Sequence, residues 1–125
     1  MKTHPQEIMI YYNANSSYGK QTVAYAHSLS RHIKELEFDK ASLTPVQWKS
    51  LLASMNIEPK NLLNKSDDYY QSNIKGKEFD EEGWLNVLSH NPNLINGSIV
   101  VMGKKVVFCK SPTEIFRILQ PTQQV

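Results

Sequence analysis

Four segments of the chain have the apolar pattern of β-strands. Ile8–Tyr12 is an unbroken apolar run, which is typical of a strand that is buried on both faces. Ser98–Met102 and Lys105–Cys109 are two further apolar runs, and the Gly103-Lys104 pair between them predicts a tight hairpin turn. Residues 33–38 alternate imperfectly between apolar and polar side chains and predict the fourth strand.

A helix is predicted between the strands at 8–12 and 33–38. Residues 22–29 place Val23 and other small apolar residues at helical spacing. Ser16 or Ser17 suits the N-cap position, because a serine hydroxyl accepts a hydrogen bond from an N–H group of the first turn. Gly19 lies in or just before that turn, so the pattern leaves the start of the helix open by a few residues.

The middle of the chain is predicted to be entirely helical. Thr44, Pro45 and Gln47 form a capping box with proline at the first helical position. The helix that they begin should end near Asn56. Residues 57–77 are less regular and predict short helices with polar joints.

Two more helices are predicted toward the C-terminus. Three acidic residues at 80–82 favour a helix start, because the macrodipole stabilises negative charge there, and the Asn-Pro pair at 91–92 ends that helix. Ser111, Pro112 and Glu114 form a second capping signal and predict a closing helix. The buried stripe expected on the first of these helices consists of Trp84, Leu85, Val87 and Leu88.

The predicted order of elements is β-α-β-α-(helices)-α-β-β-α. It indicates an α/β protein with the thioredoxin-like order of elements and an all-helical insertion at about 44–90. We expect a single domain over residues 1–125, with a four-stranded mixed sheet and helices on both of its faces. The strands at 8–12 and 33–38 should be parallel, and the strand at 98–102 should run antiparallel to the first.

Composition excludes several classes of function. The chain has 125 residues, 14 Lys or Arg and 12 Asp or Glu, and a net charge of +2 does not predict direct nucleic-acid binding or a polybasic membrane contact. Cys109 is the one cysteine, which excludes an internal disulfide, a CxxC pair and a cysteine-rich zinc site. The four histidines lack metal-ligand spacing, so neither a metal nor a cofactor is expected. The polar N-terminus and the lack of a long apolar run predict a cytoplasmic protein without a membrane span.

Four motifs, spread from about Ile8 to Leu119, resemble those of one known family. The chain is similar to the ArsC-type arsenate reductases, which have a thioredoxin-like (glutaredoxin-like) fold, and to their bacterial relatives, the Spx transcription regulators. The first motif is the strand and loop at 10–20, and the second is the segment at 59–65 with its paired leucines. The third and most specific spans 85–101 and contains Asn-Pro, Leu-Ile and a valine strand, and the fourth is Cys109-Lys-Ser-Pro-Thr-Glu114.

The chain departs from the family at the positions that the resemblance assigns to the reaction. Ser16 stands where the family has its nucleophilic cysteine, and an alcohol forms no arsenate–sulfur or mixed-disulfide intermediate. The family's oxyanion arginines correspond to Asn64, Gly97 and, nearby, Lys110, which keeps the charge but lacks the bidentate fork. Ser98 replaces the proline that is cis in thioredoxin folds, and a trans bond is expected there. The chain therefore has no predicted catalytic residue.

The first loop has two interpretations. It is either an anion site, formed by N–H groups at a helix start together with hydroxyls and a lysine, or an ordinary polar loop with a serine cap. Cys109 is likewise either a reactive thiol beside a lysine or a buried apolar residue. The candidate anion-binding residues are Asn13, Asn15, Ser16, Ser17, Lys20 and Lys110.

Three functions follow from the resemblance and its departures. The first is a non-catalytic relative of the arsenate reductases, a pseudoenzyme that binds an unknown protein partner or a small oxyanion. The second is a thiol-dependent, arsenate reductase-type oxidoreductase with altered chemistry that uses Ser16 or Cys109 differently. The third is an Spx-like regulator that contacts the transcription machinery through the helical insertion, without redox sensing at the first loop.

Overall fold

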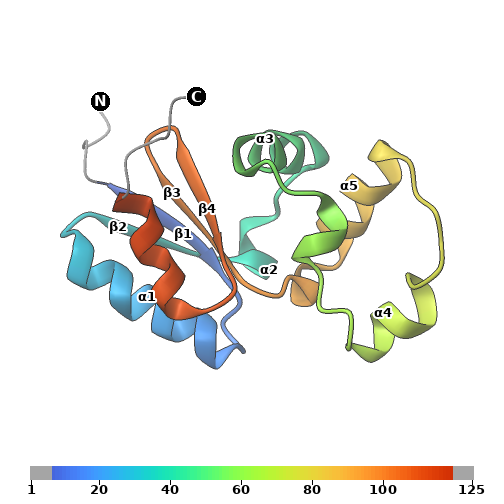
Figure 1. Ribbon diagram of the computed structural model, residues 1–125, viewed down its shortest axis with the longest axis horizontal. Helices are drawn as coiled ribbons and strands as arrows, with labels where there is room; N and C mark the ends of the chain where they lie inside the picture. Colours follow the sequence, from blue (N-terminus) through green and yellow to red (C-terminus); the bar gives the residue numbers. More distant parts are fainter. Residues whose placement is uncertain (1–6, 120–125) are drawn as a thin grey trace.

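A four-stranded mixed sheet forms the centre of the computed structural model, which describes residues 7–119. Its order is β2-β1-β3-β4, with β1 parallel to β2 and β3 antiparallel to both β1 and β4 (Figure 1). These pairings and the α/β class confirm the prediction. Most of the N-terminus considered above, residues 1–6, lies outside the described residues. The strands are β1 (Ile8–Tyr12), β2 (Ile33–Glu37), β3 (Ser98–Met102) and β4 (Lys105–Cys109).

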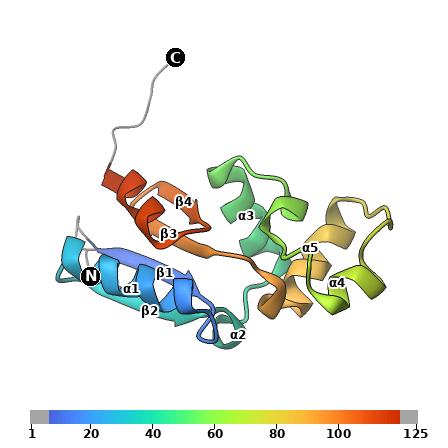
Figure 2. The same cartoon turned by 60° about the horizontal axis from the view of Figure 1, so that its bottom comes forward.

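One face of the sheet is covered by α1 (Ser17–Leu29) and the 3-10 helix η3 (Pro112–Leu119), which lie side by side (Figures 1 and 2). Strand side chains alternate between faces, so Ile8 and Ile10 of β1 both point toward these helices. The core on this side is completed by Val23, Ala26, Val100, Val107, Cys109, Ile115 and Ile118.

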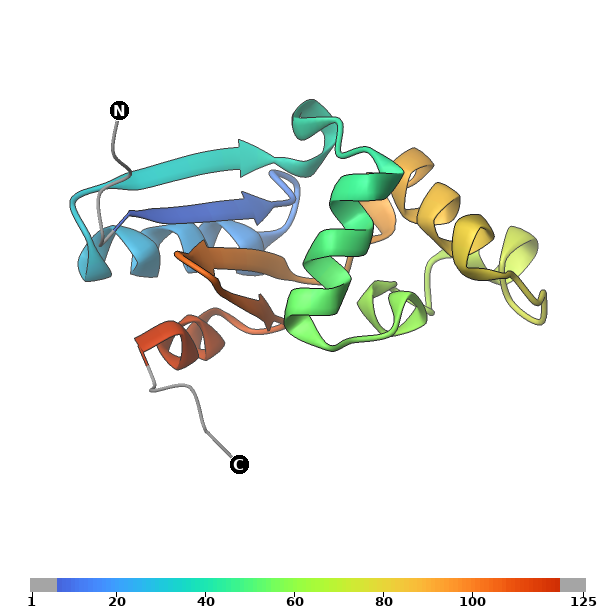
Figure 3. The same ribbon diagram turned by 90° about the horizontal axis from the view of Figure 1, so that it is seen from above.

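The other face of the sheet packs against the helical segment that connects β2 to β3. Ile99 and Phe108 are buried there together with the apolar side chains of the helices. In Figure 3, α3 runs across the strands at the end where β1 and β4 finish. The sheet therefore has helices on both faces, as expected. The helices of this segment are α2 (Phe38–Ala41), α3 (Pro45–Met55), η1 (Pro59–Leu62), α4 (Asp68–Asn73), α5 (Glu81–His90) and η2 (Pro92–Leu94).

The capping signals place the helix starts well. Thr44 Oγ1 accepts from Gln47 N and Gln47 Oε1 accepts from Thr44 N, which is the predicted capping box. Asn56 ends α3 in a left-handed conformation (φ 54°). The residue after β1 that caps α1 is Ser16, so this helix begins at Ser17 and contains the whole segment predicted at 22–29.

Three local predictions need correction. The second strand ends at Glu37, because Phe38 turns into the core and stacks between Tyr11 and Trp48 with ring centroids 6.2 and 6.0 Å away. The closing helix is a 3-10 helix, and Glu114 N bonds to the Ser111 carbonyl oxygen three residues back rather than four. The apolar stripe on α5 is only partly buried, because Trp84 and Val87 are half-exposed.

Candidate functional site

The positions at which the chain departs from the ArsC pattern gather at one end of the sheet. β1 ends there, and because β3 is antiparallel to β1 and β4 to β3, β3 begins and β4 ends at the same place. Ser98 pairs with Cys109 in this register. The loop after Tyr12 and residue Lys110 are thus separated by two strand spacings, roughly 10 Å.

The loop from β1 to α1 is held by its own side chains. Asn13 Oδ1 accepts a hydrogen bond from Asn15 N (3.1 Å), and the Asn13 carbonyl oxygen accepts from Ser16 N (3.0 Å). Ser16 Oγ accepts from Gly19 N at 3.1 Å, which makes this hydroxyl the N-cap of α1. The side chain at the family's cysteine position therefore has a capping role here.

The cap leaves few donors for an anion. Within the described residues, the N–H groups of Ser17 and Tyr18, at the first two helical positions, have no acceptor. The Ser17 hydroxyl accepts from Gln21 Nε2 (3.0 Å), and Lys20 is exposed one turn further along. A bound anion would thus meet two N–H groups, one hydroxyl and one exposed ammonium.

A small cavity beside this loop has the wrong charge for an anion. It has a volume of about 40 Å³ and is lined by Asn13, Asn15, Phe38, Asp39, Pro92 and Asn93. The Asp39 carboxylate on the lining of this cavity repels anions, so an oxyanion should bind on the Ser17 side of the loop. The sequence alone does not predict Asp39 at this position, because the approach of α2 to the loop depends on the packing of Phe38.

Lys110, the remaining candidate, lies next to a fixed carboxylate. Glu114 Oε1 accepts from Lys110 N (2.7 Å) and from Ser111 N (2.9 Å). Burial raises the pKa of Glu114, but the hydrogen bonds from Ser111 and Lys110 and the charge of Arg117 outweigh it and lower the pKa. The Glu114 carboxylate thus occupies both backbone N–H groups, and what Lys110 can offer an oxyanion is its side-chain ammonium, which lacks the bidentate fork of an arginine.

Gly97, where the resemblance places an arginine, is enclosed by β4. A Cβ atom there would lie 2.6 Å from Phe108 Cζ and 2.7 Å from the Cys109 carbonyl oxygen, both far inside contact distance. The Phe108 ring is buried in the core. The Phe108 ring therefore fills the space next to residue 97. An arginine at this position would clash with that ring.

The other two altered positions, Asn64 and Ser98, are held in place by hydrogen bonds and by burial. The Leu63–Ile95 bridge and the bond from Asn64 N to the Leu94 carbonyl oxygen (2.8 Å) hold the 62–64 segment against the start of β3. Asn64 Oδ1 accepts from the Ser66 hydroxyl at 2.7 Å. Ser98 is buried, and no peptide bond within residues 7–119 is cis, as expected for this serine.

Cys109 is buried in the core between the sheet and η3. Burial raises the pKa of its thiol to about 12, although Arg117 acts in the opposite direction. The interpretation of this residue as a buried apolar side chain is confirmed, and a thiol in this state is a poor nucleophile.

We expect Cys109 to react with a thiol reagent such as dithionitrobenzoate at pH 8 only through opening of the fold. The folded protein should react at least 100-fold more slowly than the protein in guanidinium chloride. Because the unfolded thiol ionises near pH 9 and the folded thiol near 12, the free energy of unfolding should fall as the pH rises through this interval. Rapid stoichiometric labelling of the folded protein would contradict this assignment.

Comparison with known proteins identifies the family. The model of the ArsC family matches residues 11–118. The chain belongs to the ArsC family. No curated protein is similar enough in sequence to match it. Among the described residues of this ArsC-family protein, no helix is long and apolar enough to cross a membrane.

Solved structures share the ArsC fold at low sequence identity. A putative arsenate reductase from Yersinia pestis is 20% identical, covers 89% of this chain and 99% of its own, and has a TM-score of 0.80. An arsenate reductase from Vibrio cholerae is 17% identical, with 92% and 99% coverage and a TM-score of 0.82. A putative ArsC family related protein from Bacteroides fragilis is 16% identical, with 90% and 98% coverage and a TM-score of 0.72. The helical segment between β2 and β3 is thus part of the shared fold.

Proposed function

We propose that this ArsC-family protein does not reduce arsenate and acts as a binding module for a protein partner or a small oxyanion. The observation that carries the proposal is the packing of Phe108 against Gly97, which leaves no room for the arginine of the family pattern. The Ser16 hydroxyl supports it by capping α1. A buried Cys109 with a raised pKa disfavours a reaction that uses the remaining thiol.

Any oxyanion would bind at the start of α1 and would bind weakly. The available donors are the N–H groups of Ser17 and Tyr18, the Ser17 hydroxyl and the Lys20 ammonium, and no arginine is among them. A contact at a helix N-terminus contributes roughly 0.3–1 kcal/mol when exposed and up to about 2 kcal/mol when partly buried. About 2 kcal/mol corresponds to a dissociation constant on the order of tens of millimolar, and a smaller contribution to weaker binding.

A phosphate titration followed by NMR at low ionic strength tests whether the protein binds a small oxyanion. Backbone amide shifts should be confined to residues 13–20, should disappear in Lys20→Ala and should weaken with added salt. Lys34→Ala removes an equally exposed lysine from β2 and should change nothing. If tens of millimolar phosphate shift no amide in the loop, the protein partner becomes the sole proposed ligand.

A further inference from the structure

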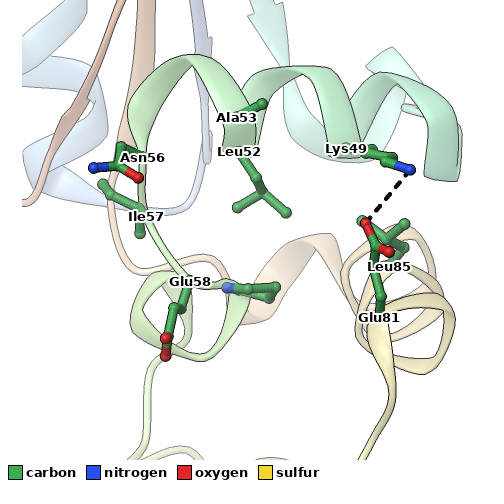
Figure 4. Close-up of a pocket in the computed structure, with 9 residues that line it drawn as sticks. Lys49, Leu52, Ala53, Asn56, Ile57, Glu58, Glu81 and Leu85 are labelled. Carbon is green, nitrogen blue, oxygen red and sulfur yellow. Dashed lines mark ion pairs between the residues drawn. The ribbon is translucent and has the colours of Figure 1, made fainter.

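A second and larger cavity lies in the helical segment, between α3, the start of η1 and the first turns of α5 (Figure 4). Its volume is about 310 Å³, at the lower end of the range of ligand pockets. Leu52 points into it from α3, and Leu85 and the half-buried Ile57 complete an apolar floor. The cavity is thus large enough for one bulky apolar side chain of a ligand.

The polar groups around this groove leave negative charge uncompensated. α3 has no basic residue in its last turn, so the negative end of its dipole meets no cation from the helix itself. Glu58 lines the edge of the groove and is exposed, with its carboxylate pointing away from Leu52 (Figure 4), and within residues 7–119 it forms no ion pair. At the other end of the groove, Glu81 Oε1 is 3.5 Å from Lys49 Nζ, and both side chains are largely exposed.

The net charge of the surrounding helical segment also favours a positively charged ligand. Residues 44–90 contain seven Asp or Glu and five Lys, although the whole chain carries a net charge of +2. A cation next to an apolar group would satisfy Glu58 and the end of α3 while the apolar group fills the floor. A carboxylate in the same place would meet two unfavourable charges.

We propose that the groove formed by Leu52, Ile57, Leu85, Glu58 and Lys49 binds a peptide segment of a partner protein in which a large apolar side chain neighbours Lys or Arg. The inference deepens the binding role proposed above by naming the class of partner. It uses residues outside the loop at 13–20, so either site can fail its test without the other.

The probes for the test are two matched dipeptides, acetyl-Leu-Arg-amide and acetyl-Leu-Glu-amide, titrated into the full chain and followed by NMR. The basic dipeptide should shift the amides of residues 52–58 and 85 at millimolar concentration. The acidic dipeptide should bind at least threefold more weakly. Equal binding of the two dipeptides, or no shifts in this region at 20 mM of the basic one, would overturn the proposal.

Substitutions at the two ends of the groove should change the affinity for the basic dipeptide in opposite directions. Lys49→Met keeps the apolar stem but frees Glu81, so the basic dipeptide should bind two- to fivefold more tightly, the range of one exposed ion pair. Glu58→Gln should weaken it by a similar factor. Ala53→Trp, on the lining of the groove, should abolish binding, whereas Ser54→Trp, equally exposed on α3 and outside the lining, should not. Weaker binding to Lys49→Met would contradict the charge argument.

Discussion

Arsenate reduction by the wild-type protein, with glutathione and glutaredoxin as reductants, is expected to stay at the background rate. Each oxyanion donor that is lost typically lowers the rate by about 10²–10³-fold, and here the nucleophile is missing as well. Asn64 is neutral, Gly97 has no side chain, and Lys110 keeps a positive charge but lacks the bidentate fork of an arginine. The measurement is coupled oxidation of NADPH, with a cysteine-containing ArsC protein assayed in parallel. Turnover within tenfold of that reference would refute the proposed function.

Ser16→Cys should produce a reactive thiol without producing a reductase. The new side chain would lie at the N-terminus of α1, where the dipole lowers a thiol pKa, so it should react readily with dithionitrobenzoate. Cys109, buried in the same molecule, provides the internal control for labelling. Arsenate turnover should remain at background, because positions 64 and 97 still lack cationic side chains. Recovery of turnover by this single substitution would show that the arginine positions are dispensable.

Gly97→Ala should destabilise the protein by about 1–3 kcal/mol, the usual effect of overpacking a core. The added methyl group would lie 2.6 Å from Phe108 Cζ and 2.7 Å from the Cys109 carbonyl oxygen, and the second of these atoms belongs to the backbone and yields little. The melting temperature should fall by several degrees. Chemical denaturation followed by tryptophan fluorescence gives the free energy of unfolding.

A double-mutant cycle isolates the role of the phenylalanine ring. Phe108→Leu removes the two ring atoms closest to residue 97, so Gly97→Ala should cost clearly less in that background than in the wild type. Unchanged stability of Gly97→Ala in the wild-type background would show that this region adapts easily. The absence of an arginine would then be an ordinary substitution and would no longer support the proposed function.

The order of the main elements and the boundaries of α3 and α5 could be predicted from the sequence alone. The signals were local: a capping box at Thr44, a serine cap at Ser16 and unbroken apolar runs for β1, β3 and β4. Local hydrogen bonds fix such boundaries wherever the segment is placed in the fold. The resemblance added the family and the positions at which this chain departs from it.

The meaning of those departures depends on contacts between residues that are distant in the chain. No local pattern indicates that the Phe108 ring fills the space beside Gly97, because the two residues meet only through the pairing of β3 with β4. The same holds for Asp39 near Asn15, since α2 reaches the loop through the burial of Phe38. The groove at Leu52 and Leu85 likewise depends on how α3 packs against α5. Each of these contacts joins residues that are far apart in the chain. They depend on how whole elements pack together, and no local sequence pattern predicts that packing.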